Sequence, residues 1–147
     1  RRIARIRGID EHIAVRFAPT GLIRADGGPR IPLATLDQSL PIGAFCGTGN
    51  PAAFSRTLTD LGLQVTARSY GDHHGYTNAD WDDLLTWSAQ FPGGLLTTLK
   101  DLVKLPPSHP LVDRVAALDI GVEFLAGQQH LDRRLTQLIP VSHRAAA

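Results

Sequence analysis

The 147-residue sequence contains a single cysteine, Cys46, and has no long uninterrupted hydrophobic run. One cysteine cannot form a disulfide within the chain, and no Cys/His spacing of a structural zinc site is present, so a reducing compartment fits best. No segment approaches the roughly 18 consecutive apolar residues of a membrane-spanning helix. With 43% hydrophobic and 20% charged residues, the composition is typical of one globular domain.

The sequence also contains no methionine and begins RRIARIRGIDEH, so we interpret it as a piece of a longer product. A signal peptide is not expected, because the basic start lacks a continuous apolar segment and a small-residue cleavage site. The net charge is only +1, yet residues 1–30 hold seven arginines against three acidic residues. This local excess predicts contact with phosphates or anionic lipid headgroups, although a solvated face would give the same pattern.

Residues 1–40 are expected to form a linker or a short β hairpin. Ile13 to Phe17 has the character of a strand that ends at Pro19. Ile23 then begins the expected partner strand, before the turn ADGGPR, in which Asp-Gly-Gly permits positive φ.

Strand and helix patterns alternate through the rest of the chain. PIGAFC is an apolar strand, after which Asn50 and Pro51 begin a helix that Gly62 ends. LQVTARS is the next strand, and Thr77 begins a second helix with Asp80 as its capping-box acid. The buried side of that helix is expected at Trp81, Leu84, Leu85, Ser88 and Phe91. The remaining expected elements are a strand at LLTT, a helical turn at KDLVKL, a strand at about 115–124 and a helix at about 127–138.

This alternation predicts an α/β fold with a mostly parallel sheet and helices on both faces. We place the α/β domain at residues 41–140, followed by a tail at residues 141–147. In such a sheet, ligands bind beyond the carboxyl ends of the strands, where the connecting loops converge. Three unusual turns are expected at that edge: CGTGNP, GDHHGY and TTLKD.

The first and third turns offer groups that could bind an anion. In CGTGNP, two glycines and a helix start leave backbone N–H groups free to approach an anion, or the glycines only permit a tight turn. The turn is not a Walker A loop, because G-x-x-x-x-G-K-[ST] occurs nowhere in the sequence. In TTLKD, a lysine and a carboxylate could face a ligand, or they could pair on the surface beside ordinary strand threonines. The candidates in these turns are Gly47, Thr48, Gly49, Asn50, Thr97, Thr98, Lys100 and Asp101.

The second turn places Asp72, His73 and His74 in succession. A carboxylate beside two imidazoles suits metal binding or proton transfer. In the alternative interpretation, one imidazole hydrogen-bonds the turn and the other faces water. Because adjacent side chains in an extended turn point opposite ways, we expect His73 to face the crevice and His74 to point away. Tyr76 and Trp81 are expected to pack this loop onto the helix that follows.

Taken together, AFCGTGNPAAF, DHHGYTNAD and LLTTLKDLVKL, in this order and spacing, resemble the C-terminal half of the tetraacyldisaccharide 4'-kinase family. The likeness is good over residues 41–105 and looser in the flanks. It implies a fold like that of P-loop NTPases and transfer of the γ-phosphate of ATP, with Mg²⁺, to the 4'-hydroxyl of a lipid A disaccharide precursor. It further implies action at the cytoplasmic face of the inner membrane of Gram-negative bacteria, with an anionic membrane surface and an N-terminal kinase half as partners. No nucleic-acid partner is implied.

The resemblance assigns to the acid-His-His turn a histidine that assists a catalytic carboxylate of the N-terminal half. We carry this role to His73, with Asp72 to poise the imidazole and His74 as the less favoured bearer. Tyr76 and the candidates of the other two turns are placed near the substrate or nucleotide. This chain has Leu99 where the family usually has Glu, which weakens the roles of Lys100 and Asp101. Because the chain has no Walker A motif, we expect ATP and Mg²⁺ to be bound mainly by the N-terminal half and the chain alone to be inactive.

Two other interpretations remain open at the level of sequence. Metal-dependent Asp-His-His phosphoesterases use such a triplet to ligate metal ions, but they need further aspartates on preceding strands, and this chain has no Asp-x-Asp pair there. We therefore predict no metal site in this chain. The third interpretation is a non-enzymatic α/β module in which the histidines stabilise a turn.

Overall fold

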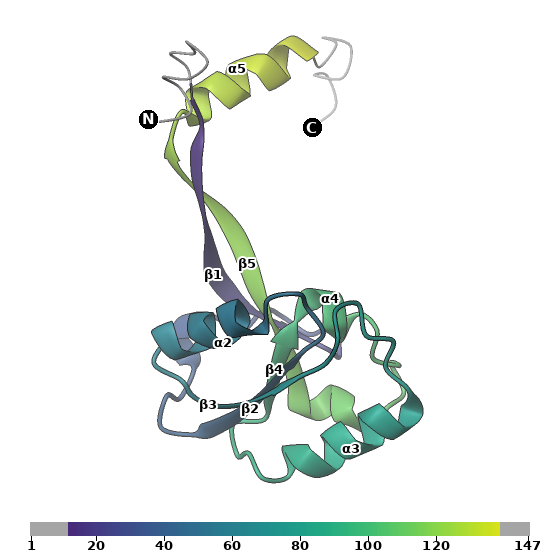
Figure 1. Ribbon diagram of the computed structural model, residues 1–147. Helices are drawn as coiled ribbons and strands as arrows, with labels where there is room; N and C mark the ends of the chain where they lie inside the picture. Colours follow the sequence, from purple (N-terminus) through teal and green to yellow (C-terminus); the bar gives the residue numbers. More distant parts are fainter. Residues whose placement is uncertain (1–11, 139–147) are drawn as a thin grey trace. The chain divides into compact units, whose positions relative to one another are not determined.

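The computed structural model describes residues 12–138 (Figure 1). The arginine-rich start at residues 1–8 and the tail at residues 141–147 lie outside these described residues. The chain packs as two units, one comprising Pro19–Ile120 and the other comprising the residues before and after it. The expected boundary between residues 40 and 41 stays a prediction.

The described elements follow one another as strand and helix along most of the chain (Figure 1). The strands are β1 (Ala14–Arg24), β2 (Pro41–Cys46), β3 (Gln64–Ser69), β4 (Leu95–Thr98) and β5 (Val115–Ala126). The helices are α2 (Pro51–Asp60), α3 (Asn78–Ser88), α4 (Leu99–Leu102) and α5 (Gln128–Leu138), with 3-10 turns η1 (Leu33–Thr35) and η2 (Pro110–Arg114).

The five strands form one sheet in the order β1-β5-β4-β2-β3. β2 pairs in parallel with both β3 and β4, and β4 pairs in parallel with β5. The β1 strand is antiparallel to β5, because Arg16 bonds to Glu123 while Thr20, further along β1, bonds to the earlier Asp119. The expected mostly parallel α/β sheet is thereby confirmed.

The expected hairpin near the start was wrong in two respects. β1 does not end at Pro19 but continues to Arg24. Proline is tolerated there because β1 is the edge strand of the sheet. On the side of an edge strand that has no neighbouring strand, a missing N–H costs no interstrand hydrogen bond. The chain does reverse after β1, but Ile31 meets Leu22 in an isolated antiparallel bridge and forms no second strand.

Helices pack on both faces of the sheet, as expected (Figure 1). On one face, Phe45 of β2 and Leu95 of β4 pack in a core with Leu84 of α3. The neighbouring residues Ala44 and Leu96 point to the other face and pack with Leu58 of α2. These two central strands, β2 and β4, therefore contribute apolar side chains alternately to two cores, as buried parallel strands do.

The helix ends follow the predicted capping chemistry. The Asn50 side chain accepts from the Ala53 N–H at the start of α2. Gly62 follows α2 with a φ of +80°, a conformation that a residue with a Cβ adopts only with strain. Thr77 and Asp80 form the expected capping box of α3. Because the cap fixes where α3 begins, it also fixes where the preceding Asp-His-His loop ends.

The buried face of α3 is wider than predicted. Trp81, Leu84 and Ser88 are buried as expected, and so is Phe91 just beyond the helix, while Leu85 is only partly buried. Trp87 was not predicted, yet it is buried in the same core, with the Arg68 guanidinium lying 4.1 Å from its ring centroid. The ring also meets Phe91 edge to face with centroids 4.8 Å apart, so both the core and a cation from β3 cover it.

Candidate functional site

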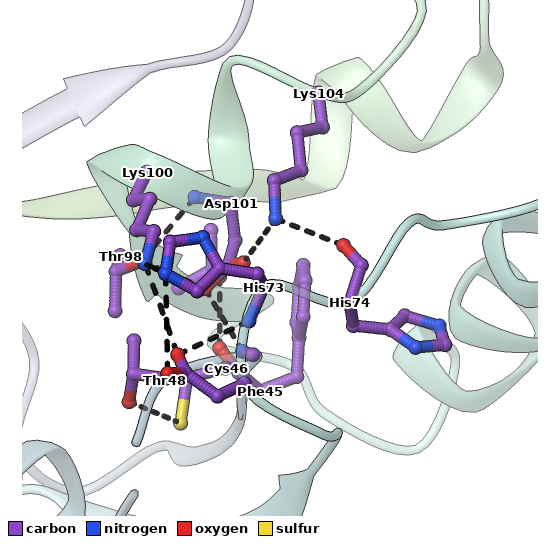
Figure 2. Close-up of polar contacts among 12 residues, drawn as sticks. Phe45, Cys46, Thr48, His73, His74, Thr98, Lys100, Asp101 and Lys104 are labelled. Carbon is purple, nitrogen blue, oxygen red and sulfur yellow. Dashed lines mark hydrogen bonds and ion pairs between the residues drawn. The ribbon is translucent and has the colours of Figure 1, made fainter. Parts of the chain in front are cut away.

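The three unusual turns meet at the carboxyl edge of the sheet (Figure 2). They follow β2, β3 and β4, which are adjacent and parallel, so their carboxyl ends lie side by side. Two hydrogen bonds that backbone N–H groups donate join the turns directly. The Gly47 N–H donates to Asp101 Oδ2 over 3.0 Å, and the His73 N–H donates to the Gly47 carbonyl over 3.2 Å. The predicted gathering of these turns is confirmed; the catalytic role of their residues stays a prediction.

Asp101 is the buried centre of this arrangement, with none of its side chain exposed. Its Oδ2 atom accepts the Gly47 N–H and also the Thr98 hydroxyl, at 2.7 Å. Its Oδ1 atom lies 3.3 Å from Lys104 Nζ. The expected alternative of a surface pair between Lys100 and Asp101 was wrong, because Asp101 points into the protein and Lys100 Nζ lies 3.8 Å from Asp72 Oδ1.

His73 carries the exposed imidazole of the site, with 75% of its side chain accessible. Its backbone is in the left-handed region, with a φ of 57°. The ring Nε2 lies 3.3 Å from Lys100 Nζ and 3.9 Å from Asp72 Oδ2. A carboxylate, an imidazole and an ammonium therefore lie together at the rim. Such a group can accept a proton from a bound hydroxyl and offset negative charge.

His74 has a different environment, and Figure 2 shows its ring directed away from His73. The ring Nε2 lies 3.3 Å from Asp80 Oδ2, and the ring stacks on Tyr70 with centroids 4.7 Å apart. The pKa of Asp80 is lowered, first by the backbone N–H of Thr77, then by the Thr77 hydroxyl, with a smaller contribution from His74. The predicted opposite orientation of the two histidines is confirmed, and His74 helps to pack the loop.

Tyr76 packs the loop onto α3, as predicted. Its ring stacks on Trp81 with centroids 4.4 Å apart and meets Phe45 edge to face. Burial raises the pKa of the Tyr76 phenol strongly, and the nearby Asp101 carboxylate adds to this effect. The phenol therefore remains protonated at neutral pH. Its placement near a nucleotide stays a prediction.

The other predicted residues of the glycine turn and of β4 are mostly engaged within the protein. The Gly47 N–H is not free for an external anion, because the Asp101 carboxylate already accepts it. The side chain of Asn50 caps α2, and the buried Thr97 hydroxyl donates to the Phe45 carbonyl over 2.8 Å. Thr48 Oγ1 lies 3.7 Å from the Cys46 sulfur. Gly49 lies against Asp72, and a Cβ added to Gly49 would lie 3.4 Å from Asp72 Oδ2.

Lys104 was missed by the sequence analysis. Its Nζ donates to the His74 carbonyl over 2.9 Å in addition to pairing with Asp101. The available signal was the i, i+3 spacing of Asp101 and Lys104 in KDLVK, which places both on one side of a helical turn. This spacing alone could not identify the pair, because nothing in the sequence shows that Asp101 is buried.

A metal centre is not apparent in the part of the chain that the structure describes. Within residues 12–138, no three His, Cys, Asp or Glu side chains gather as they would around a metal ion. The structure thus offers no observation that favours the metal-dependent phosphoesterase interpretation.

Between residues 12 and 138, no helix combines the length and the apolar character that crossing a membrane requires.

Comparison with known proteins gives a consistent family. The family model described as tetraacyldisaccharide-1-P 4'-kinase matches residues 4–140. A tetraacyldisaccharide 4'-kinase of Methylorubrum populi is 39% identical over 98 residues, which is 66% of this chain and 29% of that protein. One of Anaeromyxobacter sp. is 37% identical over 93 residues, 63% of this chain and 25% of that protein. This chain therefore spans less than a third of the length of these relatives.

A solved structure shares the fold. The crystal structure of LpxK from Aquifex aeolicus in complex with ATP superposes with a TM-score of 0.63 and 23% identity, over 87% of this chain and 36% of that one. At this identity the likeness supports the α/β fold. The family model covers nearly the whole sequence, and we conclude that the chain belongs to the tetraacyldisaccharide-1-P 4'-kinase family.

Proposed function

We propose that this chain forms the C-terminal part of an ATP-dependent lipid A 4'-kinase, which phosphorylates the 4'-hydroxyl of a tetraacyldisaccharide 1-phosphate. The observation that carries the proposal is the exposed cluster of Asp72, His73 and Lys100 at the carboxyl edge of the sheet. Family membership, the names of the relatives and the ATP complex of the structural neighbour support it.

In this proposal, His73 helps to orient and deprotonate the attacking sugar hydroxyl. As the hydroxyl oxygen bonds to the γ-phosphorus, its proton must leave and the bond from that phosphorus to the bridging oxygen of ADP must break. An exposed imidazole beside Asp72 can take the proton directly or support a carboxylate that takes it. Lys100 then offsets negative charge on the phosphoryl oxygens.

ATP and Mg²⁺ are bound mainly outside this chain in our proposal. The sequence contains no Walker A motif, and residues 12–138 gather no metal-ligand cluster. The exposed carboxylate, imidazole and ammonium fit contact with the transferred phosphoryl group and do not fit a resident Mg²⁺ site.

The acceptor in this proposal is a lipid, so the protein works at a membrane surface. We propose peripheral attachment at the cytoplasmic face of the inner membrane, with contact to anionic headgroups through the arginine-rich start of the chain. Those arginines are Arg1, Arg2, Arg5 and Arg7, and they lie outside the described residues.

The decisive experiment compares two adjacent histidines in a full-length protein that carries this chain. We expect His73→Ala to lower kcat for 4'-phosphorylation by roughly 10²-fold or more, the usual scale for a positioned acid-base group. His74→Ala should cost much less in rate, since its ring packs against Tyr70 and pairs with Asp80. The 147-residue chain assayed alone should show no turnover. Equal and small effects of the two substitutions would contradict the proposed role of His73.

A further inference from the structure

We propose that Lys104 is the positioning residue of the Asp-His-His loop and sets the place of the His73 imidazole through the backbone; this inference rests on the proposed function of His73. Lys104 follows α4, and its ammonium reaches across to the loop after β3. Figure 2 shows this ammonium between the Asp101 carboxylate and the His74 carbonyl.

Lys104 is held at three points. Its Nζ donates to the His74 carbonyl over 2.9 Å and pairs with Asp101 Oδ1 over 3.3 Å. It also lies 5.3 Å from the centroid of the Tyr76 ring. Only 29% of the side chain is exposed. A charge-assisted hydrogen bond to a carbonyl in such a partly buried place is stronger than a neutral one.

Asp101 ties the same lysine to the other two turns. Its second oxygen holds the Gly47 N–H and the Thr98 hydroxyl, while the Gly47 carbonyl accepts the His73 N–H. Lys104 and Asp101 thus close a ring of bonds that runs through all three turns. Through this ring, the position of the loop is coupled to β2 and β4, which are paired and mostly buried strands of the sheet.

The His73 ring depends on such support because packing does not hold it. The ring is 75% exposed, and it lies beside two other exposed side chains, Lys100 and Asp72. Its backbone adopts the left-handed conformation, which non-glycine residues enter only when the surroundings favour it. Gly71 and Gly75 flank the loop, and a Cβ at either would meet nothing within 4 Å. The backbone bonds therefore determine where the imidazole sits.

A double-mutant cycle in the full-length kinase separates this role from a purely structural ion pair. Lys104→Met should lower kcat about tenfold or more with little change in the KM for ATP, since small misplacements of a reacting group are costly. In the His73→Ala background the same substitution should cost less than about threefold, because the group that it positions is already gone. Lys104→Arg, which keeps a charged donor, should restore most of the rate. Arg56→Met, at an exposed position of α2, is the matched control for loss of a cation.

A second measurement does not depend on activity. Amide hydrogen exchange at His73 and His74 should become faster in Lys104→Met and stay unchanged in Arg56→Met. If the Met variant does not fold, Lys104→Gln, which tolerates hydration at this partly exposed place, takes its role in both measurements.

The results of these two measurements distinguish a failure of this proposal from a failure of the proposed function of His73. Unchanged exchange in the loop, or an equal loss of rate in both His73 backgrounds, overturns the proposal. If His73→Ala alone leaves kcat unaffected, the proposed function of His73 fails, whereas faster exchange in Lys104→Met would still assign Lys104 to holding the loop.

Discussion

Replacing Asp101 with asparagine tests how much the buried carboxylate contributes to folding. Donors face both of its oxygens: the Gly47 N–H and the Thr98 hydroxyl on Oδ2, and Lys104 on Oδ1. An asparagine amide offers one oxygen and one NH₂ group. Whichever way the amide turns, its NH₂ group meets a donor. The favoured arrangement keeps the oxygen toward Gly47 and Thr98, so that Lys104 loses its partner.

The expected change in the free energy of unfolding follows from the ion pair with Asp101 that Lys104 loses. Breaking a buried ion pair costs about 3–5 kcal/mol, and losing one hydrogen bond to a charged group costs about 1.5–3 kcal/mol. Lys104 is 29% exposed, so water and the His74 carbonyl compensate part of the loss. We therefore expect Asp101→Asn to lower the free energy of unfolding by about 2–3 kcal/mol. The double variant with Lys104→Met should recover part of this, because no ammonium is then left without its partner.

Tryptophan fluorescence during urea unfolding is a suitable assay. Both tryptophans of the protein, Trp81 and Trp87, lie in α3 and in the core beneath the site, so the signal reports on the unit that holds Asp101. Asp60→Asn, at an exposed position at the end of α2, is the control and should change stability by less than about 0.5 kcal/mol. A loss from Asp101→Asn as small as the control's would refute the argument that this carboxylate organises the three turns.

Three further predictions concern acid stability, thiol reactivity and membrane binding. The lowered pKa of Asp80 means that its carboxylate stabilises the fold above about pH 4 and loses this effect as pH falls through the lowered value. Urea unfolding of Asp80→Asn should therefore differ most from wild type near neutral pH and converge with it in acid; a constant difference would contradict this. Cys46 is buried and its thiol pKa is raised by that burial, so a thiol reagent should label it at least roughly a hundredfold more slowly in the native protein than in urea, and comparable rates would mean that the site opens readily. The arginine-rich start should give weak, salt-sensitive binding to anionic vesicles, measured by co-sedimentation, and deletion of residues 1–8 should abolish it; binding unaffected by the deletion would exclude this segment as the contact.

Local chemistry made much of the fold predictable from the sequence. Asn50 and Pro51 mark the start of α2, and Thr77 with Asp80 marks the start of α3, because caps act within a few residues of the chain. Apolar runs separated by such helices indicate a parallel sheet, which places the three turns at one edge. The opposite directions of His73 and His74 were also confirmed, although His73 has a left-handed backbone and not the extended one on which that prediction rested.

The rest depended on contacts between distant parts of the chain. Pro19 could continue β1 only because β1 lies at the edge of the sheet, and strand order is not written in any local segment. Trp87 is buried between the core, where it meets Phe91, and the guanidinium of Arg68 on β3. The sequence suggested a surface pair of Lys100 and Asp101 and missed the pair of Asp101 with Lys104, since burial is a property of the assembled fold. The sequence by itself determined which chemical groups arrive at the rim, whereas the tertiary structure decided which of them face outward and which hold the others in place.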